Sequence, residues 1–182
     1  ARAIFARNLH ADPREITFTS GGSEADNQAL RTAAALGEKR GKRHIVSTKF
    51  EHHAVLHPMQ KLERQGFSVT YLQPDAEGRV SLEALQAALR PDTILVSIMM
   101  VNNESGAVMP IERMARLTHR VCPNALFHTD AVQGFFKVPF RARTLGADLI
   151  SVSAHKVHGI KGAGALYIRP GLSLPPFVLG GG

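Results

Sequence analysis

The sequence predicts an α/β fold, a mostly parallel sheet with helices on both faces, which makes three layers. Short β-rich runs alternate with helix-like runs along the 182 residues, as in repeated strand–helix–strand units. The run ILVSIMMV (94–101) is apolar on nearly every residue, which is typical of a strand buried on both faces. Glycine and polar residues follow the predicted strands, where a parallel sheet binds its ligands.

The predicted strands come at regular intervals along the chain. In order they are EITFTS (15–20), RHIVST (43–48), FSVTYL (67–72), TILVSIMMV (93–101), ALFHTDAV (125–132) and ADLISVS (147–153). A last run, GALYIR (164–169), follows its predecessor too closely for a helical crossover. We therefore expect this last strand to pair antiparallel.

Four helices are predicted from the periodicity of apolar residues. They cover ARAIFARNLHADP (1–13), SEADNQALRTAAALGEKR (23–40), SLEALQAALR (81–90) and PIERMARLTHRV (110–121). Ser81 is the expected N-cap of the third helix. In the fourth, Pro110 occupies the first turn, and Ile111, Met114, Ala115 and Thr118 share one stripe.

Composition restricts the class of protein. The net charge is +7, but the densest basic run, EKRGKRH (38–44), is interpreted as a solvated helix end. Aromatic residues make up 6% and Trp is absent, which disfavours a nucleic-acid partner. No apolar run reaches about 18 residues, so no membrane span is predicted. The single cysteine, Cys122, fits a reducing compartment, and we predict a cytoplasmic protein.

The first strand is followed by GGSEADN (21–27). Gly21 and Gly22 let the backbone approach a ligand closely. Ser23 opens a helix whose free N–H groups favour an anion, so this segment is a candidate phosphate cradle. The alternative is a plain helix cap, since Ser23 and Asp26 have capping-box spacing.

The other strand ends also carry polar side chains that a ligand could use. A metal site would draw on His52, His128, Asp130, His155 and His158, but Cys pairs and an H-E-x-x-H motif are absent, so we predict no metal. A dinucleotide site is disfavoured because SGGSEA does not supply G-x-G-x-x-G.

Pyridoxal phosphate (PLP) uses the whole set, because it needs a lysine, an acid at its pyridine nitrogen and a phosphate cradle. Lys156 directly follows a strand and is the candidate amine, while Lys161 lies in a glycine-rich turn. Asp130 can hold the proton of the pyridine nitrogen. The candidate phosphate ligands are Gly21, Gly22, Ser23, Ser153 and His155.

Five blocks in this order resemble the cysteine desulfurase branch of the class V aminotransferase-like enzymes. They are ITFTSGGSEADN, EHHAVLHP, DTILVSIMMVNNESGAVMPI, FHTDAVQGFFKVPF and ADLISVSAHKVHGIKGAGALYIR. The resemblance implies the large domain of a fold-type I PLP-dependent transferase over residues 1–182. The chain lacks an initiator methionine and stops at VLGGG, so we expect a piece truncated at both ends, without the small C-terminal domain.

The resemblance also implies a role for each candidate residue. Lys156 would bond covalently to PLP, and His52 would stack on the pyridine ring and take part in proton transfer. The remaining cofactor-binding residues would be Asp130 at the pyridine nitrogen, Gln133 at the ring hydroxyl, Asn103 near the substrate carboxylate and ring hydroxyl, and Gly22, Ser23, Ser153 and His155 at the phosphate.

The implied activity is removal of sulfur from L-cysteine, which gives alanine and an enzyme persulfide on a cysteine beyond Gly182. The implied partners are a sulfur-acceptor or scaffold protein and a second copy in a homodimer, with iron–sulfur cluster assembly as one use of the sulfur. Two alternatives stay open. One is another class V enzyme, such as a selenocysteine lyase or a small-amino-acid aminotransferase, and the other is a non-catalytic fragment.

Overall fold

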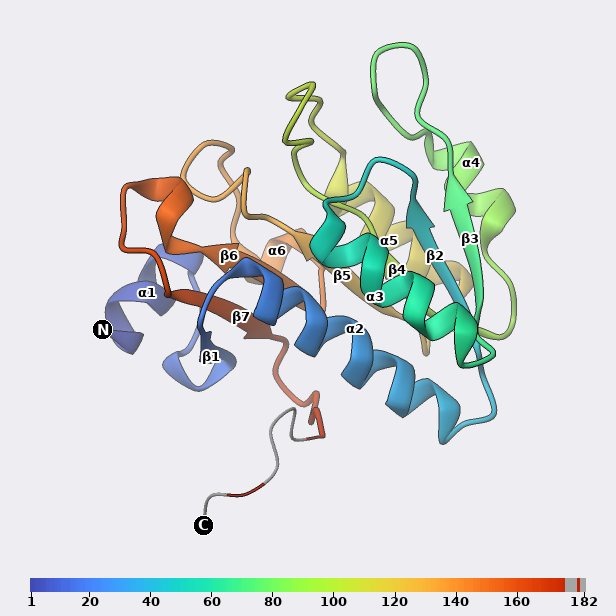
Figure 1. Ribbon diagram of the computed structural model, residues 1–182, viewed down its shortest axis with the longest axis horizontal. Helices are drawn as coiled ribbons and strands as arrows, with labels where there is room; N and C mark the ends of the chain where they lie inside the picture. Colours follow the sequence, from blue (N-terminus) through green and yellow to red (C-terminus); the bar gives the residue numbers. More distant parts are fainter. Residues whose placement is uncertain (176–179, 181–182) are drawn as a thin grey trace.

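One seven-stranded sheet runs through the molecule, as the computed structural model shows (Figure 1). The structure describes residues 1–175 and 180, so the predicted domain, 1–182, extends into residues outside the described part. The strand order is β1-β7-β6-β5-β4-β2-β3. The strands are β1 (Ile16–Thr19), β2 (His44–Thr48), β3 (Ser68–Leu72), β4 (Thr93–Ser97), β5 (Leu126–Asp130), β6 (Leu149–Ser153) and β7 (Gly164–Ile168).

The central strands are parallel, as predicted. Strands β2 to β6 pair parallel with their neighbours among themselves. Strand β7 lies between β1 and β6 and pairs antiparallel with both. The prediction for residues 164–169 is therefore confirmed, because the short segment between β6 and β7 cannot cross back over the sheet.

Helices cover both faces of the sheet, which confirms the three-layer prediction. In Figure 1, α2 and α3 lie in front of the sheet and α4, α5 and α6 lie behind it. The helices are α1 (Arg2–Leu9), α2 (Gly22–Glu38), α3 (His53–Arg64), α4 (Leu82–Ala88), α5 (Ile111–Val121) and α6 (Ala142–Leu145), with short 3-10 helices at Pro13–Glu15 and Ala154–Val157.

Each face of the sheet has its own core. On the α2–α3 side, Leu30 and Met59 pack with Ile45 and Leu95 of the sheet. On the other side, the predicted stripe of α5 is confirmed, because Ile111, Met114, Ala115 and Thr118 are all buried. Apolar burial on both faces stabilises the central strands by about 25 cal/mol for each Å² removed from water.

Some predicted boundaries are wrong. Strand β4 ends at Ser97, and Val101 makes only an isolated bridge with Val108. The next residues still bond to β5, from Ile98 N to the His128 carbonyl and from Met100 N to the Asp130 carbonyl, at 3.1 and 2.9 Å. The chain then turns where the Asn102 side chain accepts backbone N–H bonds from Glu104 and Ser105, at 3.0 and 2.8 Å. Helix α6 has four residues, too few to produce a periodic signal.

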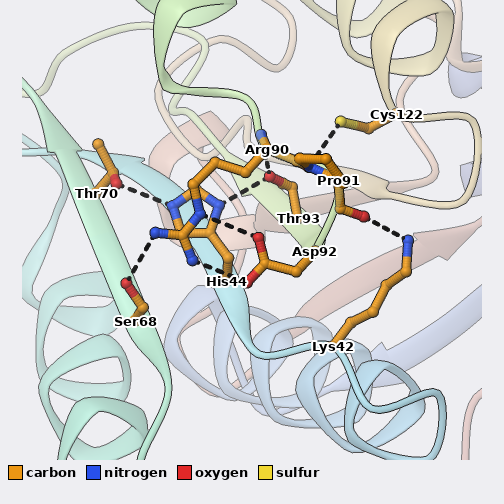
Figure 2. A network of polar contacts seen from close by, with 9 residues as sticks. All are labelled: Lys42, His44, Ser68, Thr70, Arg90, Pro91, Asp92, Thr93 and Cys122. Carbon is orange, nitrogen blue, oxygen red and sulfur yellow. Dashed lines mark hydrogen bonds and ion pairs between the residues drawn. The ribbon is translucent and has the colours of Figure 1, made fainter.

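A polar network ties the amino ends of β2, β3 and β4 together (Figure 2). The His44 ring is fully buried, and its Nδ1 and Nε2 pair with the hydroxyls of Thr93 and Thr70, at 2.8 and 2.9 Å. The backbone carbonyl of Arg90 accepts from Cys122 Sγ at 3.2 Å. Cys122 is buried, as expected for a small apolar residue. This edge lies opposite the carboxyl ends of the strands.

Replacing His44 with glutamine should make the free energy of unfolding less sensitive to a fall in pH. Burial lowers the pKa of His44 from 6.5 to about 4, so between these values the unfolded chain binds a proton that the folded protein excludes. The wild type therefore loses up to about 3 kcal/mol of unfolding free energy from this group as the pH falls from 6.5 to 4. Chemical denaturation at several pH values should show a shallower loss in His44→Gln.

The matched control is Thr93→Val, which removes a hydrogen-bond partner of His44 but keeps the imidazole. We expect it to lower stability at every pH and to keep the wild-type pH slope. Equal slopes in His44→Gln and the wild type would contradict the assignment.

Among the described residues, no helix is both long enough and apolar enough to cross a membrane.

Candidate active site

A cavity of about 340 Å³ opens at the carboxyl edge of the sheet. Its walls come from the segments that follow β1, β2, β4, β5 and β6, as expected where parallel strands end side by side. All nine predicted site residues line it, namely Gly22, Ser23, His52, Asn103, Asp130, Gln133, Ser153, His155 and Lys156. The predicted juxtaposition of Lys156 and Asp130 on one cavity is therefore confirmed.

One end of the cavity is built to receive an anion. Helix α2 begins at Gly22, and its N-cap, Gly21, makes no side-chain hydrogen bond to the first turn. The alternative of a Ser23 cap is therefore wrong. Instead, Glu24 Oε2 accepts from the Ser20 backbone N–H at 2.6 Å. The first-turn amides of a 17-residue helix thus stay available to a ligand.

Close packing brings this helix start against the ends of β5 and β6. A Cβ at Gly22 would lie 2.7 Å from Val132 Cγ2 and 3.5 Å from Ser153 Cβ, so only glycine fits without a shift. The Ser153 hydroxyl pairs with His155 Nδ1 at 2.7 Å. A hydroxyl, an imidazole and backbone amides therefore face the same end of the cavity.

Lys156 lies on the short helix Ala154–Val157, directly after β6. The turn that follows is closed by a hydrogen bond from Gly159 N to Ala154 O, at 2.9 Å. Lys161 is exposed and, in the described part of the chain, is not among the residues lining this cavity. The structure thus favours Lys156 over Lys161 as the amine of the site.

Asp130 is the last residue of β5 and is 5% exposed. Its Oδ1 accepts from the Val132 backbone N–H at 2.8 Å. Burial and, to a smaller extent, the nearby Asp26 together raise the pKa of Asp130 to about 7, while the Val132 N–H bond, His128 and His52 oppose the shift. A cation bound at this carboxyl would favour its ionised form.

His52 enters the cavity from the N-cap of α3. Its Nδ1 accepts from the Ala54 backbone N–H at 3.1 Å, which fixes the ring and leaves Nε2 free of this bond. The residue before His52, the buried Glu51, accepts hydrogen bonds from Thr48 Oγ1 and Met99 N, at 2.7 and 2.9 Å. Burial raises the pKa of Glu51 to about 8. These bonds hold the segment that carries His52.

Asn103 and Gln133 complete the predicted set on the cavity wall. Gln133 Oε1 accepts from Lys137 Nζ at 2.9 Å. Asn103 follows Asn102, whose Nδ2 donates to the Phe50 carbonyl at 3.0 Å and so ties the two loops together. Both predicted residues are therefore positioned by neighbours outside the cavity.

Sequence reasoning missed the part played by Asp26 and His128. Asp26 lines the cavity and is 1% exposed, and burial raises its pKa to about 7. The available signal was its position on α2, because Asp26 shares the apolar face with Ala29, Leu30 and Ala33. A charged residue on such a face points to a buried polar site.

His128 lies in the core below Asp130 and makes no metal cluster. Its Nδ1 pairs with Ser97 Oγ and its Nε2 with Ser151 Oγ, both at 2.9 Å. Burial lowers the pKa of His128 to about 4. Among the described residues, no group of three or more His, Cys, Asp or Glu is arranged to hold a metal ion.

The three-layer fold, with an amine, a buried acid and an anion cradle on one cavity, agrees with a known class of proteins. The chain belongs to the Aminotransferase class-V family, whose sequence profile matches residues 1–182. Cysteine desulfurase IscS of Vibrio atlanticus (strain LGP32) is 50% identical over 184 residues, which cover 100% of this chain and 45% of that protein. The putative cysteine desulfurase IscS 1 of Bacillus subtilis (strain 168) is 50% identical over 181 residues, with 100% and 47% covered.

Solved structures of similar proteins share the fold of this chain. A NifS-like protein superposes with a TM-score of 0.95 at 44% identity, covering 99% of this chain and 49% of that chain. SspA in complex with cysteine superposes with a TM-score of 0.91 at 42% identity, covering 99% and 52%. The predicted family and fold are confirmed. The chain spans about half the length of the curated relatives it matches.

Proposed function

We propose that this chain is the PLP-binding part of a cysteine desulfurase, which takes sulfur from L-cysteine and leaves alanine. The observation that carries the proposal is the single cavity onto which Lys156, Asp130 and the start of α2 all open. Relatives named cysteine desulfurase, about 50% identical over the whole chain, support the choice of substrate.

The residues present fit PLP by their chemistry. At Gly22 a Cβ would collide with the Val132 side chain, so the glycine lets the start of α2 pack closely against Val132 and Ser153, with its backbone amides on the cavity where they can hold a phosphate. Asp130 is a buried acid that needs a cationic partner to ionise. When bound, PLP supplies an electron sink for the carbon atom that loses a proton.

We assign the cofactor-binding and proton-transfer roles to this chain's own residues. Lys156 Nζ would hold the cofactor covalently and then act as an amine base. Asp130 would keep the proton on the pyridine nitrogen, and His52 would pack on the ring and move a proton through Nε2. Gln133 and Asn103 would orient the ring hydroxyl and the substrate. The phosphate would be held by Gly22, Ser23, Ser153 and His155.

The remaining parts of the proposal concern the whole protein. A homodimer, a sulfur-acceptor or scaffold protein and a cytoplasmic location are all consistent with relatives named IscS. A persulfide-forming cysteine is also part of this proposal. Cys122 does not serve, because it is buried at the opposite edge of the sheet and donates to the Arg90 carbonyl.

Visible absorption tests the assignment of Lys156. The full-length protein, loaded with PLP, is expected to show the band near the violet edge of the visible that a covalent lysine adduct gives. Lys156→Ala should lose this band, because no other lysine in the described part of the chain lines the cavity. Turnover of L-cysteine to alanine should be lost with it.

Lys161→Ala is the matched control, since it removes a lysine five residues away that does not line the cavity. We expect it to keep the band. A band that persists in Lys156→Ala and disappears in Lys161→Ala would show that the amine was assigned wrongly. Absence of any band in the wild type would reject PLP as the cofactor.

A further inference from the structure

A second buried acid lies behind Asp130. Asp26 reaches the cavity from the second turn of α2, and its Oδ1 lies 3.5 Å from His128 Nε2. Ser151 Oγ pairs with the same nitrogen of His128, and Ser151 is the register partner of Asp130 on the neighbouring strand. Asp26, His128, Ser151 and Asp130 therefore form one buried cluster across α2, β5 and β6.

The Asp26 carboxyl is poorly partnered for a buried ion: the neutral Ser151 hydroxyl favours its ionised form, and burial outweighs that effect. Asp26 Oδ1 is shielded from solvent and has no hydrogen-bond partner among the described residues. His128 is the nearest imidazole, and burial keeps it neutral, so it offers no positive charge. An unpaired carboxylate in such a place is costly, and a buried group of this kind keeps its proton instead.

The neighbouring buried acids also favour protonation, whereas His52 and His128 oppose it at Asp130. The titratable groups that face Asp26 and Asp130 from the packed elements and the cavity wall are Glu24, Glu51, His52, His128, His155 and Lys156. Asp26 and Asp130 repel each other when both are ionised, and Glu51 is raised by both. Ionising several buried acids together is unfavourable, so the cluster holds protons near neutral pH.

We propose that Asp26 is a second acid of the pyridine-binding site, a positioning residue that keeps its proton while Asp130 is ionised. The proposal rests on the proposed function for its ligand. In the cofactor-free protein Asp130 also carries a proton. When a pyridine binds, this proton passes from the Asp130 carboxyl to the ring nitrogen, which leaves one carboxylate beside one pyridinium. Asp26 stays neutral, so the buried charges balance.

The first test uses the cofactor-free, full-length protein and needs no activity. Infrared spectroscopy at pH 6 should show the carbonyl stretch of protonated carboxyls from Asp26, Asp130 and Glu51, and Asp26→Asn should lose the component that comes from Asp26. The pH dependence of the free energy of unfolding, measured by chemical denaturation, should also show that Asp26 holds a proton in the folded state. The pKa of Asp26 is raised from 3.8 to about 7, so the folded state binds a proton that the unfolded chain releases. Stability should therefore fall as the pH rises from about 4 to 7, and less steeply, by one proton, in Asp26→Asn.

Glu24→Gln is the matched control, because it makes the same chemical change one half-turn away on the same cavity wall. Glu24 is bonded to the Ser20 N–H, which lowers its pKa, so it holds no proton at pH 6. Glu24→Gln should keep the infrared signal of the wild type. Identical infrared and denaturation results for Asp26→Asn and the wild type would overturn the proposal.

A second measurement covers the case in which Asp26→Asn does not fold. Wild-type protein labelled with ¹³C at the aspartate carboxyls should show two buried resonances that titrate near neutral pH. If all the aspartate resonances titrate only at low pH, the proposal is overturned. With PLP bound, the alkaline midpoint of the visible band should stay the same in Asp26→Asn, because a neutral Asp26 contributes no charge, whereas a fall of about one pH unit would show that Asp26 is ionised and would overturn the proposal. The cofactor-free tests stand even if PLP does not bind, so failure of the two proposals can be told apart.

Discussion

Replacing Asp130 with asparagine is expected to lower turnover of L-cysteine by the full-length protein by about 10²–10³-fold, the usual cost of removing one preorganised electrostatic partner of the reacting group. Asparagine keeps the shape of the side chain, and its Oδ1 can still accept from the Val132 N–H. The variant therefore removes the charge that holds the pyridinium proton and little else. Turnover and bound cofactor should be measured on the same samples.

Asp92→Asn provides the comparison. Asp92 pairs with Arg90 at 2.8 Å in the network of Figure 2 and, among the described residues, does not line the cavity. We expect normal turnover in this variant. If Asp130→Asn keeps wild-type turnover with cofactor bound, Asp130 does not stabilise the pyridinium.

The largest effect on stability is expected from Gly164→Ala in β7. A Cβ at this position would lie 2.7 Å from both Cα and C of Gly21, and 2.8 Å from the Val152 carbonyl oxygen. All three atoms belong to the backbone, so no side chain can rotate away. We expect a loss of about 2–3 kcal/mol of unfolding free energy, as for overpacked cores. Affinity for PLP should fall as well, because Gly21 is displaced.

Gly41→Ala separates this clash from a simple loss of glycine. Gly41 has φ +68 and no atom within 4 Å of a built Cβ, so only backbone strain of about 1 kcal/mol is expected. Denaturation midpoints and PLP titrations of both variants give the comparison. Equal losses in the two variants would show that the contact between Gly164 and Gly21 is not tight.

The candidate site was predictable from sequence to a large extent, because parallel strands end at one edge. Asp130 lies near the end of the predicted strand 125–132, and Lys156 comes three residues after the end of the predicted strand 147–153. Once the alternation of strands and helices indicates a parallel sheet, these residues must meet, although they lie far apart along the chain. The antiparallel last strand followed from the same logic, since its connection is too short for a helix.

The features that could not be predicted from the sequence, the burial of Asp26 and the end of β4, depend on tertiary packing. Asp26 has the spacing of a capping residue, and only the placement of α2 against β5 and β6 shows that it is buried beside His128. The end of β4 was predicted four residues too late, because residues 98–101 are apolar enough for a strand. They keep two backbone hydrogen bonds to β5 outside the regular strand, and the turn that follows is fixed by the Asn102 side chain. Such contacts join residues that no local pattern connects.

The contact between Gly21 and Gly164 has a consequence for synthesis on the ribosome. The anion cradle begins before β2, but it rests on β7, which lies between β1 and β6 and comes last along the chain among the described strands. Until β7 has emerged, β1 has no neighbour in the sheet. A nascent chain therefore cannot retain a phosphate-bearing ligand before residue 168 has left the exit tunnel, and loading with cofactor must follow translation of this segment.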